Sequence, residues 1–264
     1  MDLDLTGRVA LVTGSTRGIG YATLCGLADM GARVVLHGRT PDSVAQADDK
    51  FRAGRPGASI RTVAGDLGTA EGCHAITTAV PVVDVLVNNL GIYHMRPFAE
   101  FDDSEWQEYF QVNVMSGVRL ARHYLPAMLQ KDWGRIVFVS SESGVHIPPD
   151  MIPYGFSKAA QLAIGRGLAE TTGGTGVTVN SVLPGPTWVE TQSDRLQRLA
   201  QAERRTVDEL KRETFTVRKT SSLLGRYSTP EEVANLICYV CSPASTATNG
   251  ASLRVDGGIV RNYI

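Results

Sequence analysis

A tyrosine and a lysine four positions apart, Tyr154 and Lys158, lie in the stretch MIPYGFSKAA at residues 151–160. On a helix this spacing places both side chains on one face, about one turn apart. A free phenol has a pKa of about 10, so proton exchange near neutral pH requires a fall of about three units, equivalent to about 4 kcal/mol. A neighbouring ammonium would supply part of that stabilisation. The pair is therefore a candidate acid–base site, and the alternative is an incidental surface pair.

A glycine-rich segment, TGSTRGIG at residues 13–20, follows the first apolar run directly and leads into a helical pattern. Glycines at a strand-to-helix turn let the backbone approach a pyrophosphate, and the helix N-terminus offers N–H groups and a positive dipole end. Gly14, Gly18 and Gly20 form the spacing G-x-x-x-G-x-G. Because it follows the first strand of a βαβ unit, this segment predicts a dinucleotide-binding turn.

Short apolar runs alternate with helical patterns along most of the chain. The predicted strands cover residues 9–13, 34–37, 60–64, 82–87, 135–140, 177–182 and 252–255. The predicted helices cover residues 18–30, 41–52, 69–79, 104–129, 154–171 and 231–241. Continuous apolar strands separated by helices require a parallel sheet that is buried on both faces. The predicted fold class is therefore α/β, a doubly wound parallel sheet of the Rossmann type.

One region, from about residue 187 to residue 228, interrupts this alternation. It contains no strand pattern, and its apolar residues recur at helical spacing among mixed charges. Thr206 and Glu209 form a capping-box pattern within it. We predict a helical insert that covers the substrate site, within a single domain spanning residues 1–264.

The charge balance argues against a charged macromolecular partner. Lys and Arg total 26 against 27 acidic residues, a formal net charge of −1, so neither nucleic acid nor an anionic membrane is expected to bind. The N-terminus begins MDLD, which is acidic where a signal peptide is basic, and no apolar run reaches the length of a membrane span. We therefore expect a cytoplasmic protein.

The cysteines do not predict a disulfide framework in a chain of 264 residues. Cys238 and Cys241 form a C-x-x-C pattern, but they lie in the apolar run VANLICYVC, without a second such pair or a histidine pair at ligand spacing. Cysteine packs well as a small hydrophobic residue. We predict that both belong to a core helix and that the chain has no metal site.

The whole chain resembles the short-chain dehydrogenase/reductase family, and in particular its 3-oxoacyl-acyl-carrier-protein reductases. Each matching motif falls at the edge of the element where the family carries it. The matching residues are 13–20, Asp66, 88–91, Asn113, 140–141, Tyr154 with Lys158, 184–185, 249–250 and 256–258.

The resemblance implies a role for each residue of the candidate site. Tyr154 would exchange a proton with the substrate oxygen, while Lys158 would hold the nicotinamide ribose and favour the phenolate. A serine would hydrogen-bond the same oxygen; the usual separation from the tyrosine selects Ser141, with Ser140 as the alternative. Asn113 would anchor a water that links the lysine to solvent. The implied cofactor-binding residues are Gly14, Ser15, Arg17, Gly18, Ile19, Gly20, Arg39, Asp66, Leu67, Asn89, Gly91, Tyr154, Lys158, Pro184, Gly185 and Thr187.

The end of the second strand bears on which nicotinamide is used. Enzymes that prefer NAD usually carry an acidic residue there, which accepts a hydrogen bond from the ribose 2′-hydroxyl. Here the sequence reads HGRT, so the acid is missing and Arg39 follows, with Arg17 as a second cation in the glycine turn. These features favour NADP(H), with NAD(H) as the alternative. Replacing Gly38 with Asp and Arg39 with Leu is expected to invert that preference.

The predicted activity is reduction of a ketone or oxidation of a secondary alcohol, and the alternative is a catalytically silent dinucleotide-binding sensor or scaffold. The predicted substrate-lining residues are Tyr93, His94, His146, Met151 and Trp188. The resemblance also implies a homotetramer. A helix with many small residues would approach its symmetry mate, and these residues are Ala159, Ala160, Ala163, Gly165, Gly167 and Ala169.

Overall fold

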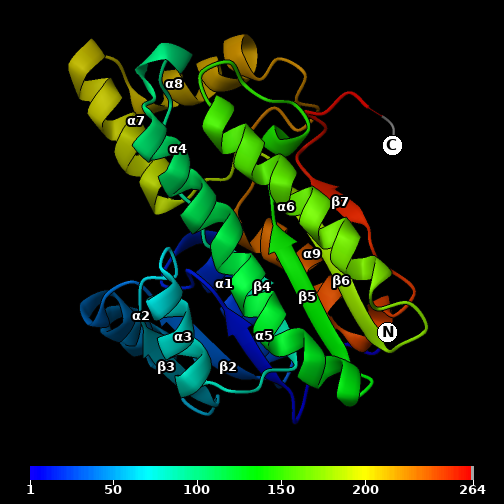
Figure 1. Cartoon of the computed structure of the whole chain (residues 1–264). Helices are drawn as coiled ribbons and strands as arrows, with labels where there is room; N and C mark the ends of the chain where they lie inside the picture. The colour runs from blue at the N-terminus through cyan, green and yellow to red at the C-terminus, as the bar shows by residue number, and fades with distance from the viewer. Residues whose placement is uncertain (263–264) are drawn as a thin grey trace.

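The computed structural model describes residues 1–262, so residues 263–264 of the predicted domain lie outside the described part. Across residues 1–262, seven parallel strands form one sheet in the order β3-β2-β1-β4-β5-β6-β7 (Figure 1). The strands are β1 Val9–Val12, β2 Arg33–Gly38, β3 Ile60–Ala64, β4 Val85–Asn88, β5 Gly134–Val139, β6 Val177–Pro184 and β7 Ser252–Val255. The predicted doubly wound α/β fold is confirmed.

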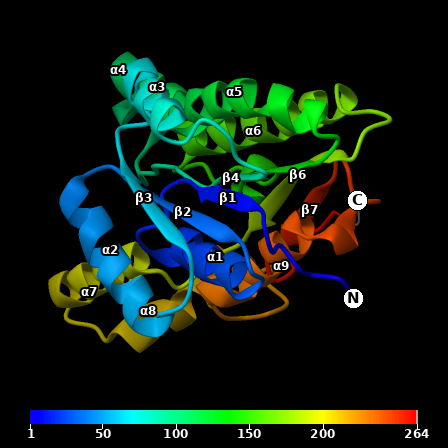
Figure 2. The same ribbon diagram turned by 90° about the horizontal axis from the view of Figure 1, so that it is seen from below.

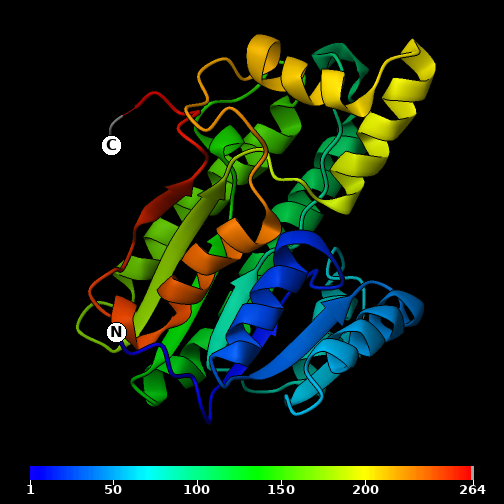
Figure 3. The ribbon, with the colours of Figure 1, turned by 180° about the vertical axis from the view of Figure 1, so that it is seen from behind.

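Helices cover both faces of the sheet. One face carries α1 Gly18–Asp29, α2 Pro41–Gly54 and α9 Pro230–Cys241, as the views from below and behind show (Figures 2 and 3). The other face carries α3 Ala70–Ala79, α4 Asp103–Tyr109, α5 Ser116–Gln130 and α6 Ile152–Glu170. Each layer has its own apolar core. Because both faces are covered, β1 and the first three residues of β4 are apolar without interruption, which is why their sequence does not alternate.

The chain is helical throughout the predicted range 104–129, but the middle of this helix is not α-helical. Residues Phe110–Met115 form a π-helical segment, with α4 before it and α5 after it. A π-helical turn adds a residue to the helical repeat and changes the direction of the side chains that follow. Asn113 lies inside this segment and is buried. The helical periodicity of the sequence does not reveal such a local insertion.

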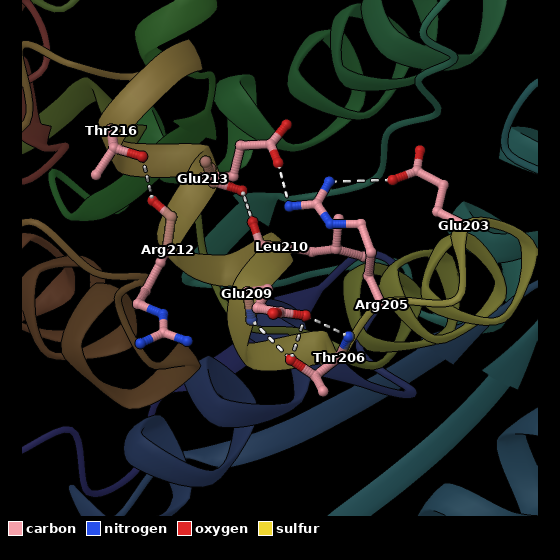
Figure 4. Close-up of polar contacts among 9 residues, drawn as sticks. Glu203, Arg205, Thr206, Glu209, Leu210, Arg212, Glu213 and Thr216 are labelled. Atoms are coloured by element: carbon pink, nitrogen blue, oxygen red, sulfur yellow. Dashed lines mark hydrogen bonds and ion pairs between the residues drawn. The ribbon is translucent and has the colours of Figure 1, made fainter.

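The region between β6 and α9 is helical, as predicted. Its helices are α7 Glu190–Glu203 and α8 Val207–Glu213, followed by a π-helical segment, Thr214–Arg218. Arg204 ends α7 in the left-handed conformation, with φ of 53°. Figure 4 shows the connection: the capping box of Thr206 and Glu209 opens α8, and Arg205 pairs with Glu203 on α7 and with Glu213 at the end of α8.

Small residues on α6 do not all lie on its outer face. Gly165 is buried, and a Cβ there would lie 2.8 Å from the Ser181 hydroxyl on β6. Ala169 is also buried, whereas Ala163 and Gly167 are exposed. The proposed contact with a symmetry mate is therefore wrong for Gly165 and Ala169, because these two residues pack against the sheet of their own chain.

Cys238 and Cys241 are buried in α9, which confirms the prediction that they are core residues. A Cβ added at Gly26 of α1 would lie 2.6 Å from Cys238 Sγ, so these two helices approach closely at that point. Among residues 1–262, no helix is both long enough and apolar enough to cross a membrane.

His37, near the end of β2, connects the glycine turn to two neighbouring strands. Gly14 N–H donates to His37 Nδ1, and His37 Nε2 donates to the carbonyl oxygen of Gly65 after β3, each at 3.0 Å. The Ser15 hydroxyl accepts from the His37 backbone N–H at 3.0 Å. Both ring nitrogens are thus used in the neutral form, and burial lowers the pKa of His37 to about 4. The sequence reading placed His37 in a strand and missed this connection.

This geometry predicts that stability depends on the protonation of His37. Its pKa is lowered on folding, so the unfolded chain binds the proton more readily and stability is lost as pH falls from about 6.5 towards about 4. In that range the wild type should lose up to about 3 kcal/mol of unfolding free energy relative to His37→Gln. Urea denaturation of both proteins at a series of pH values measures this. A pH-independent difference between them would contradict the assignment.

Candidate active site

The glycine turn between β1 and α1 is shaped by backbone conformation and by lack of space. Gly14 and Gly18 have φ of 60° and 55°, which side-chain-bearing residues rarely adopt. A Cβ at Gly20 would lie 2.4 Å from the carbonyl oxygen of Gly14 and 2.5 Å from Asn89 Nδ2. Arg17 occupies the N-cap position of α1 but makes no side-chain capping hydrogen bond. The turn therefore presents an uncapped helix N-terminus to a ligand.

Asn89, which follows β4, holds this turn from the neighbouring strand. Its side-chain Nδ2 donates to the carbonyl oxygens of Thr13 and Gly14, at 3.0 and 3.1 Å. In return, the Thr13 hydroxyl accepts from the backbone N–H groups of Asn89 and Leu90, at 2.9 and 3.0 Å. The two predicted motifs, after β1 and after β4, thus form one hydrogen-bonded unit.

A cavity of about 790 Å³ lies beside the turn. Of the predicted cofactor-binding residues, it is lined by Gly14, Arg17, Arg39, Asp66, Leu67, Asn89 and Gly91. Arg17 and Arg39 are exposed, and within residues 1–262 neither has an ion-pair partner. Lys50 of α2 also lines this cavity. The sequence reading missed Lys50, because it lies in the interior of α2 and belongs to none of the motifs.

A second cavity, of about 630 Å³, adjoins the first and shares Asn89 and Gly91 with it. Its wall includes Ile19, Ser141, Tyr154, Lys158, Pro184, Gly185 and Thr187 of the predicted site. These residues come from four separate parts of the chain, at the carboxyl ends of β1, β5 and β6 and at the start of α6. In an open parallel sheet this edge is where ligands bind.

The two adjacent serines after β5 have different surroundings. The Ser140 hydroxyl is buried and donates to the carbonyl oxygen of Lys158 at 2.8 Å. The Ser141 hydroxyl accepts from the Ser143 backbone N–H at 3.1 Å, and its place beside the Tyr154 phenol lowers the pKa of that phenol. Ser140 thus joins β5 to α6, and Ser141 is the serine that faces the tyrosine.

Burial dominates the electrostatics of the tyrosine and the lysine. It raises the pKa of the Tyr154 phenol well above its usual value, the Ser141 hydroxyl opposes the rise, and the charge of Glu142 adds to it. Burial also lowers the pKa of Lys158 to about 7. The Lys158 ammonium lies 5.6 Å from the centroid of the tyrosine ring and donates to the carbonyl oxygen of Val139 at 2.8 Å. In the protein alone the direction is therefore opposite to the expected fall in the tyrosine pKa, because burial is the largest cause.

Asn113 does not face either cavity, because its side chain is held within the protein. Its Oδ1 accepts from the Ile92 backbone N–H at 2.8 Å, and its Nδ2 donates to the Ile92 carbonyl oxygen and to the Ser157 hydroxyl. These bonds join the π-helical segment to the chain after β4 and to α6. Of the predicted site residues, those that line neither cavity in the described chain are Ser15, Gly18, Gly20 and Asn113.

Three of the five predicted substrate-lining residues, Tyr93, His146 and Met151, lie on the second cavity. The other two do not. The ring of His94 contacts Tyr109 with centroids 6.2 Å apart, and Trp188 packs on Tyr227 in the small core of the helical insert. The sequence suggested that His94 and Trp188 line the cavity, but in the structure their side chains pack against Tyr109 and Tyr227.

The helical insert contacts the cavity through ion pairs. Lys219, just after the insert's π-helical segment, lies 2.7 Å from Glu142, which is buried beside Ser141. Arg218 lies 2.5 Å from Asp150, in the loop before α6. All four residues line the second cavity. The insert therefore completes the wall opposite the sheet, which the sequence could not show at the level of residue pairs.

The comparisons with known proteins agree with this architecture. The short chain dehydrogenase family matches residues 8–200, which is more than half of the chain. The chain therefore belongs to the short-chain dehydrogenase/reductase family, as the sequence motifs predicted, and is an oxidoreductase of that family.

Individual relatives cover the whole chain. The uncharacterized oxidoreductase YvaG of Bacillus subtilis (strain 168) is 44% identical over 262 residues, 99% of either chain. The 3-oxoacyl-[acyl-carrier-protein] reductase FabG of Aquifex aeolicus (strain VF5) is 32% identical over 263 residues, covering 98% of this chain and 100% of the relative. L-sorbose reductase from Gluconobacter frateurii, solved with NADPH and L-sorbose, has a TM-score of 0.93 and 30% identity, over 99% of this chain and 100% of that one.

The crowding at Gly20 generates a prediction for the turn. Gly20→Ala should lower the unfolding free energy by about 1–3 kcal/mol, because the added methyl meets the backbone of Gly14 and forces it to move. Gly54→Ala is the matched control, since a Cβ there has no atom within 4 Å, and it should change stability by less than about 1 kcal/mol. Urea denaturation compares the two variants. Equal stabilities would show that the turn has room for a side chain.

Proposed function

We propose that this protein is an NADP(H)-dependent oxidoreductase that transfers a hydride between the nicotinamide and a ketone or secondary alcohol. The observation that carries the proposal is the grouping of Ser141, Tyr154 and Lys158 on one cavity wall, with the serine beside the phenol. Two hydroxyl groups that converge in this way can bind a single carbonyl oxygen. The activities named for the related reductases support the same chemistry.

The residues of the first cavity fit NADP(H). The turn has no space for a side chain at Gly20, and the N-terminus of α1 is uncapped, as a pyrophosphate site requires. Arg17 and Arg39 have no carboxylate partner within residues 1–262, so their charges are available to a 2′-phosphate. We propose the cofactor-binding residues named from the sequence, with Lys50 added. When bound, NADPH supplies the hydride.

The protonation state of the site favours reduction. Burial keeps the proton on Tyr154, and the protonated phenol is the form that donates to a carbonyl oxygen. Ser141 would orient that oxygen, and Lys158 would hold the ribose while its charge offsets the negative charge that develops on the phenol. We propose that helices α7 and α8 cover the substrate, because Arg218 and Lys219 join the insert to the cavity wall.

A screen of carbonyl compounds tests the proposal. Ketoses, 3-oxoacyl thioesters and simple ketones are incubated with NADPH or NADH, and cofactor oxidation is followed by absorbance; the corresponding alcohols are tested with the oxidised cofactors. We expect turnover with NADPH on at least one ketone class. Tight NADPH binding without turnover of any compound would instead support the catalytically silent sensor.

We also propose that the protein is a cytoplasmic homotetramer that acts on small molecules and binds neither nucleic acid nor membranes. The near-zero net charge supports the proposal that neither nucleic acid nor membranes bind, because the protein presents no strong overall electrostatic field to a charged partner. Light scattering at micromolar concentration measures the assembly. A monomer would contradict the tetramer and leave the chemistry unaffected.

Loss of the tyrosine hydroxyl should abolish proton transfer. Tyr154→Phe keeps the ring, so NADPH binding should persist while kcat falls by about a hundredfold or more. Tyr93→Phe is the matched control: its ring lies 5.8 Å from that of Tyr154 in the same cavity, and the substitution removes the same atom. Steady-state kinetics and NADPH fluorescence titration measure both variants. Near-normal turnover of Tyr154→Phe would exclude the mechanism.

The cofactor preference can be tested at Arg39. The substitution of Gly38 that the sequence suggested would crowd its neighbours, because a Cβ there would lie 2.6 Å from Thr16 Cγ2 and 2.8 Å from Val44 Cγ2, so that these side chains would have to move. Arg39→Asp reverses the charge without crowding. It should lower the NADPH-to-NADH ratio of kcat/KM by about 10- to 100-fold at low salt, and less at high salt, where the contact is screened.

A matched control for this change is Arg33→Asp. Arg33 is exposed at the opposite end of β2, away from both cavities. Arg33→Asp should leave the NADPH-to-NADH ratio of kcat/KM unchanged. If Arg33→Asp and Arg39→Asp have the same effect, or if the wild type prefers NADH, the 2′-phosphate assignment fails.

A further inference from the structure

A glutamine one turn beyond the lysine has both ends of its side-chain amide engaged. Gln161 is buried on α6, and its Oε1 accepts from the Lys158 ammonium at 3.2 Å. Its Nε2 donates to the backbone carbonyl oxygen of Asn113, 48 residues away, at 2.5 Å. The amide therefore links the ammonium to the π-helical segment. The sequence reading assigned no role to Gln161.

This link occupies a place where the family resemblance implied a water. Asn113 was expected to anchor a water leading from the lysine to solvent, yet its side chain is bonded to Ile92 and Ser157 and its carbonyl oxygen accepts from Gln161. The Lys158 ammonium thus has two protein acceptors, the Val139 carbonyl oxygen and Gln161 Oε1. Both are neutral and both are held by buried elements.

We propose that Gln161 is a positioning residue that holds the Lys158 ammonium between β5 and the π-helical segment by bridging it to the carbonyl oxygen of Asn113. This rests on the proposed function only in that Lys158 is the lysine of the active site. The amide acts through Lys158 and touches no reacting atom. An amide side chain also cannot relay a proton as a water does, so its effect is to orient the ammonium and stabilise its charge.

The surroundings of Lys158 make this acceptor important. Burial lowers the pKa of Lys158 to about 7, and no charged side chain contributes to the change. The titratable groups around the site are Tyr154 on α6, Glu142 after β5, Tyr93 after β4 and Tyr109 at the end of α4. The last three of these raise the pKa of Tyr154. Since no carboxylate within residues 1–262 is paired with the ammonium, the charged lysine depends on the Val139 carbonyl oxygen and on Gln161 Oε1.

The test removes the amide and keeps the volume. Gln161→Met should lower the pKa of Lys158 by about one unit, because a buried cation loses one of two acceptors. The chain has five lysines, so the ε-carbon of Lys158 can be followed in a ¹³C-lysine NMR titration and assigned with Lys158→Arg. The charged form exists below the pKa, so the alkaline limb of the kcat/KM profile for ketone reduction should move to lower pH by the same amount.

Gln111→Met is the matched control. Gln111 lies in the same π-helical segment and accepts from Arg119 at 2.6 Å, with no contact to Lys158. The same substitution there should leave both the NMR midpoint and the pH profile at their wild-type values. A Lys158 midpoint that is unchanged in Gln161→Met, or shifted equally by Gln111→Met, would overturn the proposal.

A measurement on the wild type keeps the inference testable if Gln161→Met does not fold. The side-chain ¹⁵N amide signal of Gln161 should titrate with the same midpoint as Lys158, since the ammonium donates more strongly to Oε1 than the neutral amine does. An amide signal that is independent of pH around that midpoint would overturn the proposal. If the wild type reduces no ketone, the proposed function fails, whereas the NMR titrations still decide the role of Gln161.

Discussion

The side-chain amide of Asn89 is the interaction on which the candidate site depends. It donates to the carbonyl oxygens of Thr13 and Gly14 and so joins the ends of β1 and β4, the two strands from which the strand order runs in opposite directions. The connecting helices leave these strands on opposite faces, so their carboxyl ends form an open crevice. Without this bond the glycine turn would have no fixed position relative to the wall that carries Tyr154 and Lys158.

A second constraint is the burial of polar groups around Lys158. A buried ammonium is costly unless it is hydrogen-bonded, and here a strand carbonyl and the Gln161 amide supply the acceptors. The backbone of the same lysine accepts from Ser140, and Asn113 is bonded on three sides. These bonds hold α6, β5 and the π-helical segment in one arrangement. The Lys158 side chain on the cavity wall is therefore oriented by buried groups behind that wall.

Much of the fold could be predicted from the sequence because it depends on local pattern. Buried parallel strands are continuously apolar, helices repeat with their own period, and glycines mark the turn that other residues cannot adopt. The seven strands were therefore placed to within a few residues across the described chain, with the largest error at β4, which begins at Val85 rather than at residue 82. Family membership followed from motifs at the ends of these elements.

Contacts between distant parts of the chain were decided only by the tertiary structure. The sequence by itself determined that strands alternate with helices along the chain, that a glycine turn follows the first strand, and that Tyr154 and Lys158 share one helix face. It did not determine which serine faces the tyrosine, that Gly38 has no space for a side chain, or that Gln161 meets Asn113. The physical reason is that periodicity records which residues are buried, whereas hydrogen-bond partners and free space depend on which buried surfaces meet.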